Sequence, residues 1–385
     1  MKYREFGDTD WKVSALGFGA MRLPTTDGKP FSGKLDVAES TRMIKYAIDH
    51  GVNYIDTAYP YHEGRSEVLL GRILKGTYRE NVRLATKSPV WLIKKGKDFD
   101  RYLNEQLKRL KMDYVDFYLF HALNKKNWKD IVLKHGLLGR AEDAVRDGRI
   151  RQLGFSFHDD YSAFKEIVDG FDGWDLCQIQ YNYMDTENQA GTKGLKYAAS
   201  KGLAVVVMEP LLGGRLANPP KPIQTILKNH SERTSPADLA LQWIWVQPEV
   251  SVVLSGMSTM GQLKGNLRSA NSSQVESLPK DRSRLIARIK KAYRALVPIP
   301  CTKCGYCMPC PNGVNIPRNF EEYVDGFVHN DFRTARMEYT RFLKKKERAG
   351  ACIGCKRCEA KCPQKISISE LMPKVHRVLG ENKPC

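Results

Sequence analysis

Short apolar runs alternate with amphipathic stretches along the first 300 residues. Apolar side chains recur at helical spacing over residues 37–50, whereas residues 83–87 and 116–121 read as strands. The pattern predicts strands at 13–21, 83–87, 116–121, 151–155, 176–180, 204–208 and 251–254, and a further short strand that ends with Tyr54 and Ile55, where Asp56 follows. It predicts helices at 37–50, 66–75, 98–110, 129–147, 160–168, 192–201 and 236–245, and another after residue 260.

This alternation of strand and helix repeats about every 30 residues, which implies parallel strands joined by right-handed crossovers. The fold class predicted is therefore α/β, a (β/α)8 barrel. The first twelve residues are expected to form a hairpin that turns at Asp8-Thr9-Asp10. A basic amphipathic helix is expected at 281–295. The segment Val297-Pro298-Ile299-Pro300 then divides a barrel domain, 1–297, from a mainly helical domain, 298–385, with helical patterns at 320–328 and 331–345.

Size and charge narrow the class of protein. A chain of 385 residues, 42% of them hydrophobic, can hold one large barrel and a small second domain. No run reaches the ~18 apolar residues of a membrane helix, and the charged start lacks a secretory signal. We expect a cytoplasmic protein with no membrane partner. The net charge of +19 suits acidic partners or a solvated surface, but no nucleic-acid motif accompanies it, so nucleic acid is not expected.

Four polar side chains come at the ends of consecutive predicted strands. Asp56 ends one strand and Tyr61 follows it, Lys87 ends the next, and His121 ends the third. In a barrel of parallel strands the chemistry is done at these carboxyl ends. A structural Asp56 and a surface Tyr61 explain their stretch equally well, and a lone lysine or histidine after a strand is usually a solvated loop residue. Four such groups at the ends of consecutive strands favour a site.

Around these residues the chain resembles the aldo/keto reductases. The stretch 53–67, NYIDTAYPYHEGRSE, nearly spells the family signature DTAxxYGxxxSE, with His62 where a glycine is usual. The resemblance runs from about residue 1 to residue 295. It implies that the protein reduces a small carbonyl substrate, or oxidises an alcohol, with a nicotinamide cofactor. The family's catalytic tetrad then falls on Asp56, Tyr61, Lys87 and His121.

The tetrad makes chemical sense residue by residue. A free tyrosine, with a pKa of ~10, holds its proton too tightly to donate it easily. We expect Lys87 to lower the pKa of Tyr61, the general acid, by favouring the phenolate. Asp56 would hold Lys87, and His121 would orient the substrate oxygen.

The resemblance also implies contacts to the cofactor. The loop 211–215 would bring backbone amides to the pyrophosphate, Ser156 and Gln178 would hold the carboxamide, Asn266 would reach the adenine, and Arg22 would contact a phosphate. The candidate cofactor-binding residues are Arg22, Ser156, Gln178, Met208, Leu211, Gly213, Gly214, Ser258, Gln262 and Asn266.

Three positions depart from the family pattern. Phe157 replaces an asparagine, Met208 replaces an aromatic residue that stacks on the nicotinamide, and residues 256–262 lack the lysine and arginine that grip the 2′-phosphate. Loss of these cations argues against NADPH. It makes NADH, or a different redox cofactor, more credible than in an ordinary member.

Eight of the ten cysteines lie in two motifs after the boundary. Such density in a cytoplasmic chain indicates metal and not disulfides. The second motif matches the bacterial ferredoxin spacing in full, whereas the last gap of the first is one residue short. Two zinc sites are the alternative. The first motif comprises Cys301, Cys304, Cys307 and Cys310, and the second comprises Cys352, Cys355, Cys358 and Cys362.

In ferredoxins each Cys-Pro cysteine serves the other cluster. The hypothesis is two [4Fe–4S] clusters: one on Cys301, Cys304, Cys307 and Cys362, the other on Cys352, Cys355, Cys358 and Cys310. The helices between the motifs resemble the α-helical ferredoxin type. Cys177 is expected to be a buried thiol, and Cys385 a free terminal one.

The combination leaves three functions open. A nicotinamide passes two electrons together and a cluster passes one, so a flavin usually mediates between them. The protein is a carbonyl reductase with an iron–sulfur domain, or an enzyme that exchanges electrons with an external ferredoxin or flavodoxin, or a non-catalytic sensor. The tetrad weighs against the sensor. The basic runs 344–346 and 356–357 would steer an acidic carrier or only solvate the surface.

Overall fold

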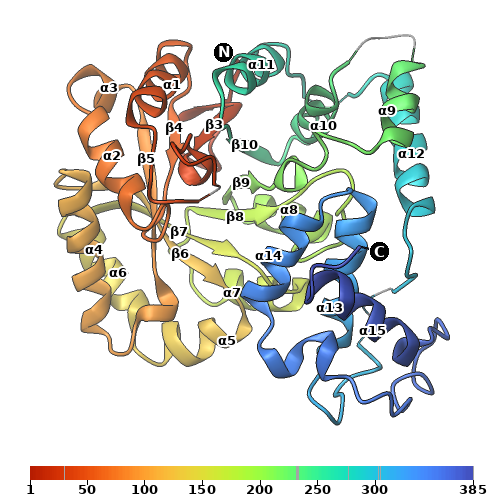
Figure 1. The fold of residues 1–385 in the computed structure, drawn as a ribbon. Helices are drawn as coiled ribbons and strands as arrows, with labels where there is room; N and C mark the ends of the chain where they lie inside the picture. The colour runs from red at the N-terminus through yellow and green to blue at the C-terminus, as the bar shows by residue number, and fades with distance from the viewer. Residues whose placement is uncertain (30, 231–233, 276, 302, 304, 385) are drawn as a thin grey trace. The chain divides into compact units, whose positions relative to one another are not determined.

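The computed structural model describes residues 1–385 except residues 30, 231–233, 276, 302, 304 and 385. Contacts divide the chain into two compact units (Figure 1). The first comprises Met1–Ala217 and Thr234–Lys280, and the second comprises Asn218–Arg233 and Asp281–Cys385. The contacts therefore group the helix α12 (Lys280–Ala295) with the second unit, whereas the sequence pattern puts the domain boundary after it.

The first unit is a closed barrel of parallel strands, which confirms the predicted fold class. The strands follow the order β10-β3-β4-β5-β6-β7-β8-β9, and Val253 of β10 lies opposite Leu16 of β3 where the ring closes. The strands are β3 (Leu16–Gly19), β4 (Tyr54–Asp56), β5 (Arg83–Ser88), β6 (Val115–Leu123), β7 (Ile150–Phe157), β8 (Leu176–Gln180), β9 (Ala204–Met208) and β10 (Val250–Gly256).

Helices follow the strands and surround the barrel. Helix α1 begins where the Asp36 side chain accepts a hydrogen bond from the amide of Glu39, an N-cap that satisfies one otherwise unpaired donor. The helices of this unit are α1 (Val37–Asp49), α2 (Arg65–Ile73), α3 (Thr77–Glu80), α4 (Lys97–Leu110), α5 (Lys125–Asn127), α6 (Leu137–Arg146), α7 (Tyr161–Asp169), α8 (Gly191–Ser200), α10 (Pro236–Trp245) and α11 (Met260–Asn271).

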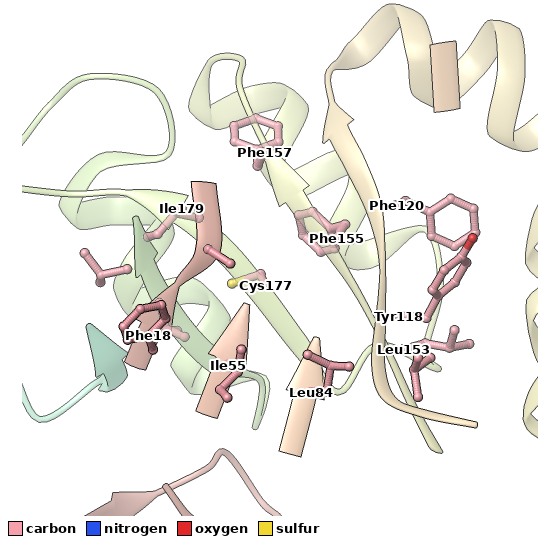
Figure 2. Close-up of a cluster of buried hydrophobic side chains, with 14 of the residues drawn as sticks. Phe18, Ile55, Leu84, Tyr118, Phe120, Leu153, Phe155, Phe157, Cys177 and Ile179 are labelled. Atoms are coloured by element: carbon pink, nitrogen blue, oxygen red, sulfur yellow. The ribbon is translucent and has the colours of Figure 1, made fainter. Parts of the chain in front are cut away.

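Apolar side chains fill both faces of the barrel wall. Phe18, Ile55 and Leu84 belong to the layer between strands and helices (Figure 2). Inside the barrel, Phe6 from the amino-terminal hairpin packs against Phe117, with ring centroids 4.9 Å apart. The hairpin, β1 (Tyr3–Glu5) and β2 (Lys12–Ser14), thus fills the end where the strands begin and leaves the carboxyl ends for a site.

Two predicted elements are wrong in their bounds. The first barrel strand starts at Leu16, not at residue 13, because residues 12–14 pair with β1 and residues 20–22 turn into a short 3-10 helix. The single helix predicted at 129–147 is broken. A π-helix over Trp128–Leu133 is followed by Gly136 at φ 61°, a left-handed conformation that glycine adopts readily, and α6 begins after it.

The second unit is mainly helical. Helices α13 (Ile316–Val328) and α14 (Phe332–Phe342) confirm the two predicted helical patterns, whereas α9 (Lys221–Lys228) and α15 (Ile368–Leu379) were not predicted. Phe320, Tyr339 and Met372 form a separate apolar core, against which described cysteines of both motifs pack. No helix in the described part of the chain is long and apolar enough to span a bilayer.

Candidate active site and cluster-binding region

The structure brings the four predicted catalytic side chains together. Asp56, Lys87 and His121 lie on the neighbouring strands β4, β5 and β6, and Tyr61 lies in the turn after β4. The Nζ of Lys87 donates to Oδ1 of Asp56 at 2.6 Å and to the Tyr61 hydroxyl at 3.3 Å. The rings of Tyr61 and His121 meet edge to face, 6.0 Å between centroids.

Lys87 is completely buried and is held in its charged form. Burial alone would lower its pKa, but Asp56 and Tyr61 together raise the pKa above the ordinary value for lysine. A third bond, from Nζ to the carbonyl oxygen of Thr57 at 2.8 Å, fixes the direction of the ammonium group. The site therefore presents a fixed positive charge beside the Tyr61 hydroxyl.

Tyr61 corrects one expectation. Burial raises the pKa of its hydroxyl, and this effect outweighs the lowering by Lys87, so the net pKa lies above the ordinary value. The expected lowering neglected the low-dielectric surroundings, which disfavour the phenolate. Tyr61 is consequently protonated at neutral pH, the state that a proton donor needs.

His121 is uncharged. Burial, followed by the nearby charges of Lys87 and His158, holds its pKa well below the ordinary value. Among the described residues nothing hydrogen-bonds its buried Nδ1. The ring of Trp91, 44% exposed, lies 5.0 Å from the His121 ring and gives the mouth of the site an aromatic wall.

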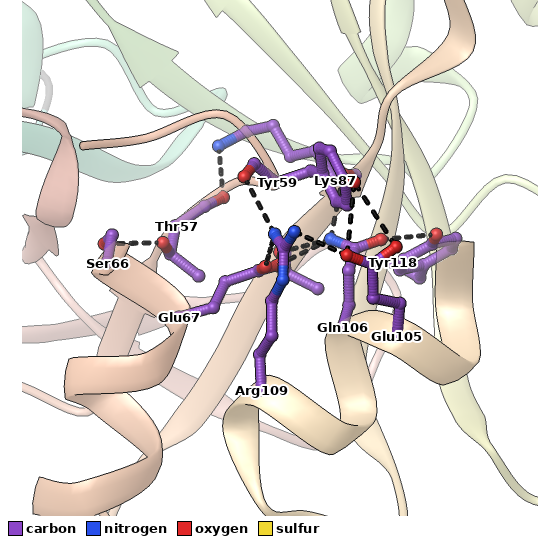
Figure 3. Close-up of polar contacts among 10 residues, drawn as sticks. Thr57, Tyr59, Ser66, Glu67, Lys87, Glu105, Gln106, Arg109 and Tyr118 are labelled. Carbon is purple, nitrogen blue, oxygen red and sulfur yellow. Dashed lines mark hydrogen bonds and ion pairs between the residues drawn. The ribbon is translucent and has the colours of Figure 1, made fainter. Parts of the chain in front are cut away.

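A buried polar network supports the strand end that carries Lys87 (Figure 3). Gln106 of α4 donates from one amide nitrogen to Glu67 at 2.6 Å and to the carbonyl oxygen of Lys87 at 3.1 Å. Thr86 donates to Glu67, and Arg109 pairs with the same carboxylate. Sequence reasoning did not find this network. Its signal was Glu67, the last residue of the family signature.

Two predicted carboxamide contacts lie beside the tetrad. Ser156 on β7 and Gln178 on β8 are paired residues in the sheet. Gln178 donates from Nε2 to Oδ2 of Asp56 at 3.1 Å, and the Ser156 hydroxyl accepts from the amide of Ala122. The carboxamide contacts of Ser156 and Gln178 stay predictions. Met208 ends β9, the next strand.

The remaining predicted cofactor residues gather on two other segments. Gly213 and Gly214 lie in a short turn at φ 66° and 95°. The Arg22 guanidinium lies 3.5 Å from where a Cβ of Gly213 would be. Within the turn, the Gly214 amide already donates to the carbonyl oxygen of Leu211 at 2.9 Å. The Arg22 cation lies beside the turn, and contact of this segment with a phosphate stays a prediction.

The other segment follows β10. The Ser258 hydroxyl donates to the carbonyl oxygen of Arg22 at 2.8 Å, and the Ser258 amide donates to Oε1 of Gln262 at 2.8 Å. Asn266 donates to the Ser255 hydroxyl at 2.9 Å and is 6% exposed, so its side chain is already engaged. The structure thus unites Arg22, Gly213 and Ser258, and the adenine contact of Asn266 stays a prediction.

In the second unit, the cysteines of the two motifs intermingle. Cys301 and Cys307 line one small cavity, of about 20 Å³, together with Cys362 of the other motif. Burial raises the pKa of Cys358 most, and Glu359, Cys352 and Cys310 raise it further, which places Cys310 near Cys358 of the second motif. Each Cys-Pro thiol therefore lies beside the opposite motif. Cys304 falls outside the described residues.

These donors fit iron–sulfur clusters. The walls of the cavity are mainly apolar, with Ile316, Phe320 and Ile366 beside the thiols. Thiolates are the ligands of [4Fe–4S] clusters, where each binds a different iron. A zinc site would require its ligands to converge on one ion, and two such sites stay the alternative. Cys177 is buried in β8, as expected.

Comparison with known proteins finds a family match for the barrel and another for the cysteine-containing region. The model of the aldo/keto reductase family matches residues 15–281, and that of a 4Fe-4S dicluster domain matches residues 300–367. L-galactose dehydrogenase of Arabidopsis thaliana is 29% identical over 307 residues, 74% of this chain and 92% of its own. NADH-specific methylglyoxal reductase of Escherichia coli is 26% identical over 322 residues, 70% of this chain and 94% of its own.

A solved structure shows the same fold. Aldo-keto reductase AKR11C1 from Bacillus halodurans superposes with a TM-score of 0.62 at 24% identity, covering 75% of this chain and 96% of that one. The family match spans most of the chain, and the described tetrad lies within it. The chain therefore belongs to the aldo/keto reductase family and carries a carboxy-terminal 4Fe-4S dicluster domain.

Proposed function

We propose that the barrel reduces a small carbonyl compound, or oxidises the corresponding alcohol, with a nicotinamide cofactor. The observation that carries this proposal is the buried ammonium of Lys87, which lies between Asp56 and the hydroxyl of Tyr61. A protonated tyrosine beside a fixed cation is suited to giving a proton to an oxygen and to holding the phenolate that remains.

Each residue has a separate task. Tyr61 donates its proton to the substrate oxygen, and Lys87 stabilises the resulting phenolate. Asp56 keeps Lys87 charged, while neutral His121 orients the substrate oxygen by a hydrogen bond. Bound nicotinamide supplies the hydride. In the oxidising direction the Tyr61 phenolate accepts the proton from the alcohol.

NADH is the proposed cofactor. Residues 256–262 contain no lysine or arginine for a 2′-phosphate. The relative named an NADH-specific methylglyoxal reductase supports this choice. Gln178 would hold the carboxamide, and Arg22 with the turn at Gly213 would hold the pyrophosphate.

The substitution Tyr61→Phe tests the reaction. It removes only the proton donor, so we expect a loss of about 10²–10⁴ in kcat with the dissociation constant of NADH unchanged. Tyr59→Phe is the matched control, because the Tyr59 hydroxyl hydrogen-bonds Glu105 and not Lys87. Initial rates with a panel of small aldehydes and ketones provide the measurement. Equal turnover in Tyr61→Phe and the wild type would refute the assignment.

A second candidate function is electron exchange with an external carrier through the clusters, with a bound flavin converting between two and one electrons. Exposed basic residues at 344–346 and 356–357 favour it, because ferredoxins and flavodoxins are commonly acidic. We expect cluster reduction by a reduced acidic carrier to slow as salt rises, since screening at 0.15 M shortens the reach of charges to about 8 Å. Stopped-flow rates at several salt concentrations check this. A salt-independent rate leaves the clusters without such a docking surface.

A further inference from the structure

His62 occupies a backbone conformation that favours glycine. Its φ is 52°, and Glu63 and Gly64 continue the left-handed turn at 57° and 81°. The family signature has glycine at this position, where no side chain opposes the turn. A histidine held there at 1% exposure must therefore be stabilised by its contacts.

Both ring nitrogens of His62 are used. Nε2 accepts a hydrogen bond from the amide of Leu23 at 3.2 Å, and Nδ1 lies 2.8 Å from the carbonyl oxygen of Ser32. An amide can only donate and a carbonyl can only accept, so the ring is neutral with its proton on Nδ1. Burial, which lowers the pKa of His62, agrees with this state. The ring thus ties together two points nine residues apart in the sequence.

Between these points runs a segment that we call the strap, residues 24–36, described except for residue 30. Its two ends pair through an isolated bridge between Thr25 and Leu35, and the Asp36 amide donates to the carbonyl oxygen of Pro24. Near its end the strap lies against the turn that follows Tyr61, since a Cβ on Gly33 would lie 2.6 Å from the carboxylate of the exposed Glu63 side chain.

The strap also reaches Arg22. The Phe31 ring lies 5.2 Å from the Arg22 guanidinium carbon, within cation–π range. Arg22 also lies close to two glycines. A Cβ built on Gly213 would be 3.5 Å from the Arg22 side chain, and a Cβ built on Gly256 would be 3.1 Å from it. The Glu209 carboxylate lies 3.7 Å from the same point beside Gly213. The Glu209 carboxylate would repel an anion bound at this turn. Binding of the anion therefore depends on the position of the Arg22 cation.

We propose that His62 fastens the strap and thereby fixes Arg22 to bind a phosphate of the dinucleotide cofactor. This inference rests on the proposed function, and it goes further by making His62 and Phe31 positioning residues for the phosphate site. A long arginine side chain in an open strap would sample many rotamers, and ordering it on binding would cost affinity. In the fastened strap, that ordering is already present before the cofactor arrives.

The substitutions His62→Gly and Phe31→Ala test the inference by binding alone. Glycine adopts a φ of 52° without strain, so His62→Gly keeps the backbone turn and removes only the imidazole ring. If the competent position of Arg22 falls to about one tenth of the population, dissociation constants for phosphate ligands rise about tenfold. We expect this rise for ADP and for NADH, titrated by calorimetry and by nicotinamide fluorescence, and no change for adenosine, which lacks phosphate.

Two further measurements sharpen the result. His50→Ala is the matched control, because the exposed His50 ring stacks on Tyr46 of its own helix and pairs with the carbonyl oxygen of that residue. Trypsin should cleave after the exposed Lys34 faster in His62→Gly than in the wild type, since the strap is then unfastened.

The outcomes separate the two proposals. Unchanged ADP affinity in His62→Gly overturns the strap inference while leaving the reductase proposal intact. Equal weakening of ADP and adenosine also overturns it, because a phosphate-specific role predicts a difference. If the wild type binds neither NADH nor NADPH, the proposed function itself is wrong and the inference falls with it.

Discussion

At the scale of single residues, Lys87 has the most demanding position. Its ammonium is fully buried, and its one ionic partner, Asp56, is 4% exposed. A buried pair of this kind is costly to break, since removing one member leaves the other charge without compensation. The ion pair with Asp56 acts against burial and keeps the lysine charged beside Tyr61, so catalysis and stability both depend on the Lys87–Asp56 contact.

The substitution Lys87→Met should therefore lower both the catalytic rate and the stability of the fold. We expect kcat to fall at least about 10²-fold because the phenolate of Tyr61 loses its cation, and the free energy of unfolding to fall by about 3–5 kcal/mol near pH 7. Burial already raises the pKa of Asp56, and Lys87 opposes that rise. In the variant, the folded pKa moves further above the unfolded value.

The sign of the pH dependence follows. A carboxyl group whose pKa is higher in the folded than in the unfolded state does not reduce stability below its unfolded-state pKa, where it is protonated in both states. Stability is lost as the pH rises through its folded-state pKa. Lys87→Met should be less stable at pH 8 than at pH 5 in urea denaturation. The double variant with Asp56→Asn should lose this slope. A slope that persists in the double variant would mean that Asp56 is not its source.

At the scale of elements, α2, α4 and β5 are joined by the network around Gln106. Helices α2 and α4 approach closely, since a Cβ on Gly71 would lie 2.4 Å from the carbonyl oxygen of Leu110. Gln106 then reaches Glu67 on one helix and the Lys87 carbonyl on the strand, and its Oε1 accepts from the Tyr118 hydroxyl. The position of the catalytic lysine is thus set partly by helices behind the barrel wall.

Gln106→Leu should destabilise the barrel by about 2–3 kcal/mol, because it leaves buried polar groups unpaired. We also expect kcat to fall more than KM changes, since the strand end at Lys87 loses its support. Tyr118→Phe is the milder control and should cost about 1 kcal/mol, as it removes a single hydroxyl. Denaturant midpoints and steady-state kinetics measure both. Equal effects of the two variants would argue against a supporting role of the Gln106 network for Lys87.

At the scale of the whole molecule, the dicluster domain should hold about eight irons and eight acid-labile sulfides per chain, about four in each cluster. Iron and sulfide assays on anaerobically purified protein check this count. Cys310→Ala should affect the cluster of the second motif, because Cys310 lies near Cys358. Zinc in place of iron, or a variant that loses the other cluster, would contradict the crossed arrangement.

Local patterns were sufficient for much of this protein. The barrel strands and the tetrad were readable because burial imposes continuous apolar runs and because parallel strands place their carboxyl ends at one edge. The break after residue 133 was not readable from periodicity, since Gly136 interrupts a pattern that is otherwise helical. Helix α15 escaped prediction although its apolar face packs in the core of the second unit.

Other features exist only through contacts between distant parts of the chain. Spacing put Lys87 near Tyr61, but only the fold revealed that burial outweighs the ammonium and raises the pKa of the hydroxyl. The sequence marked His62 as a departure, and the tertiary structure alone showed its ring between Leu23 and Ser32. Sequence by itself determined which groups the chain places at its strand ends and in its motifs. Packing decided their charge, their partners and their freedom to move, because these depend on the surroundings that the rest of the chain supplies.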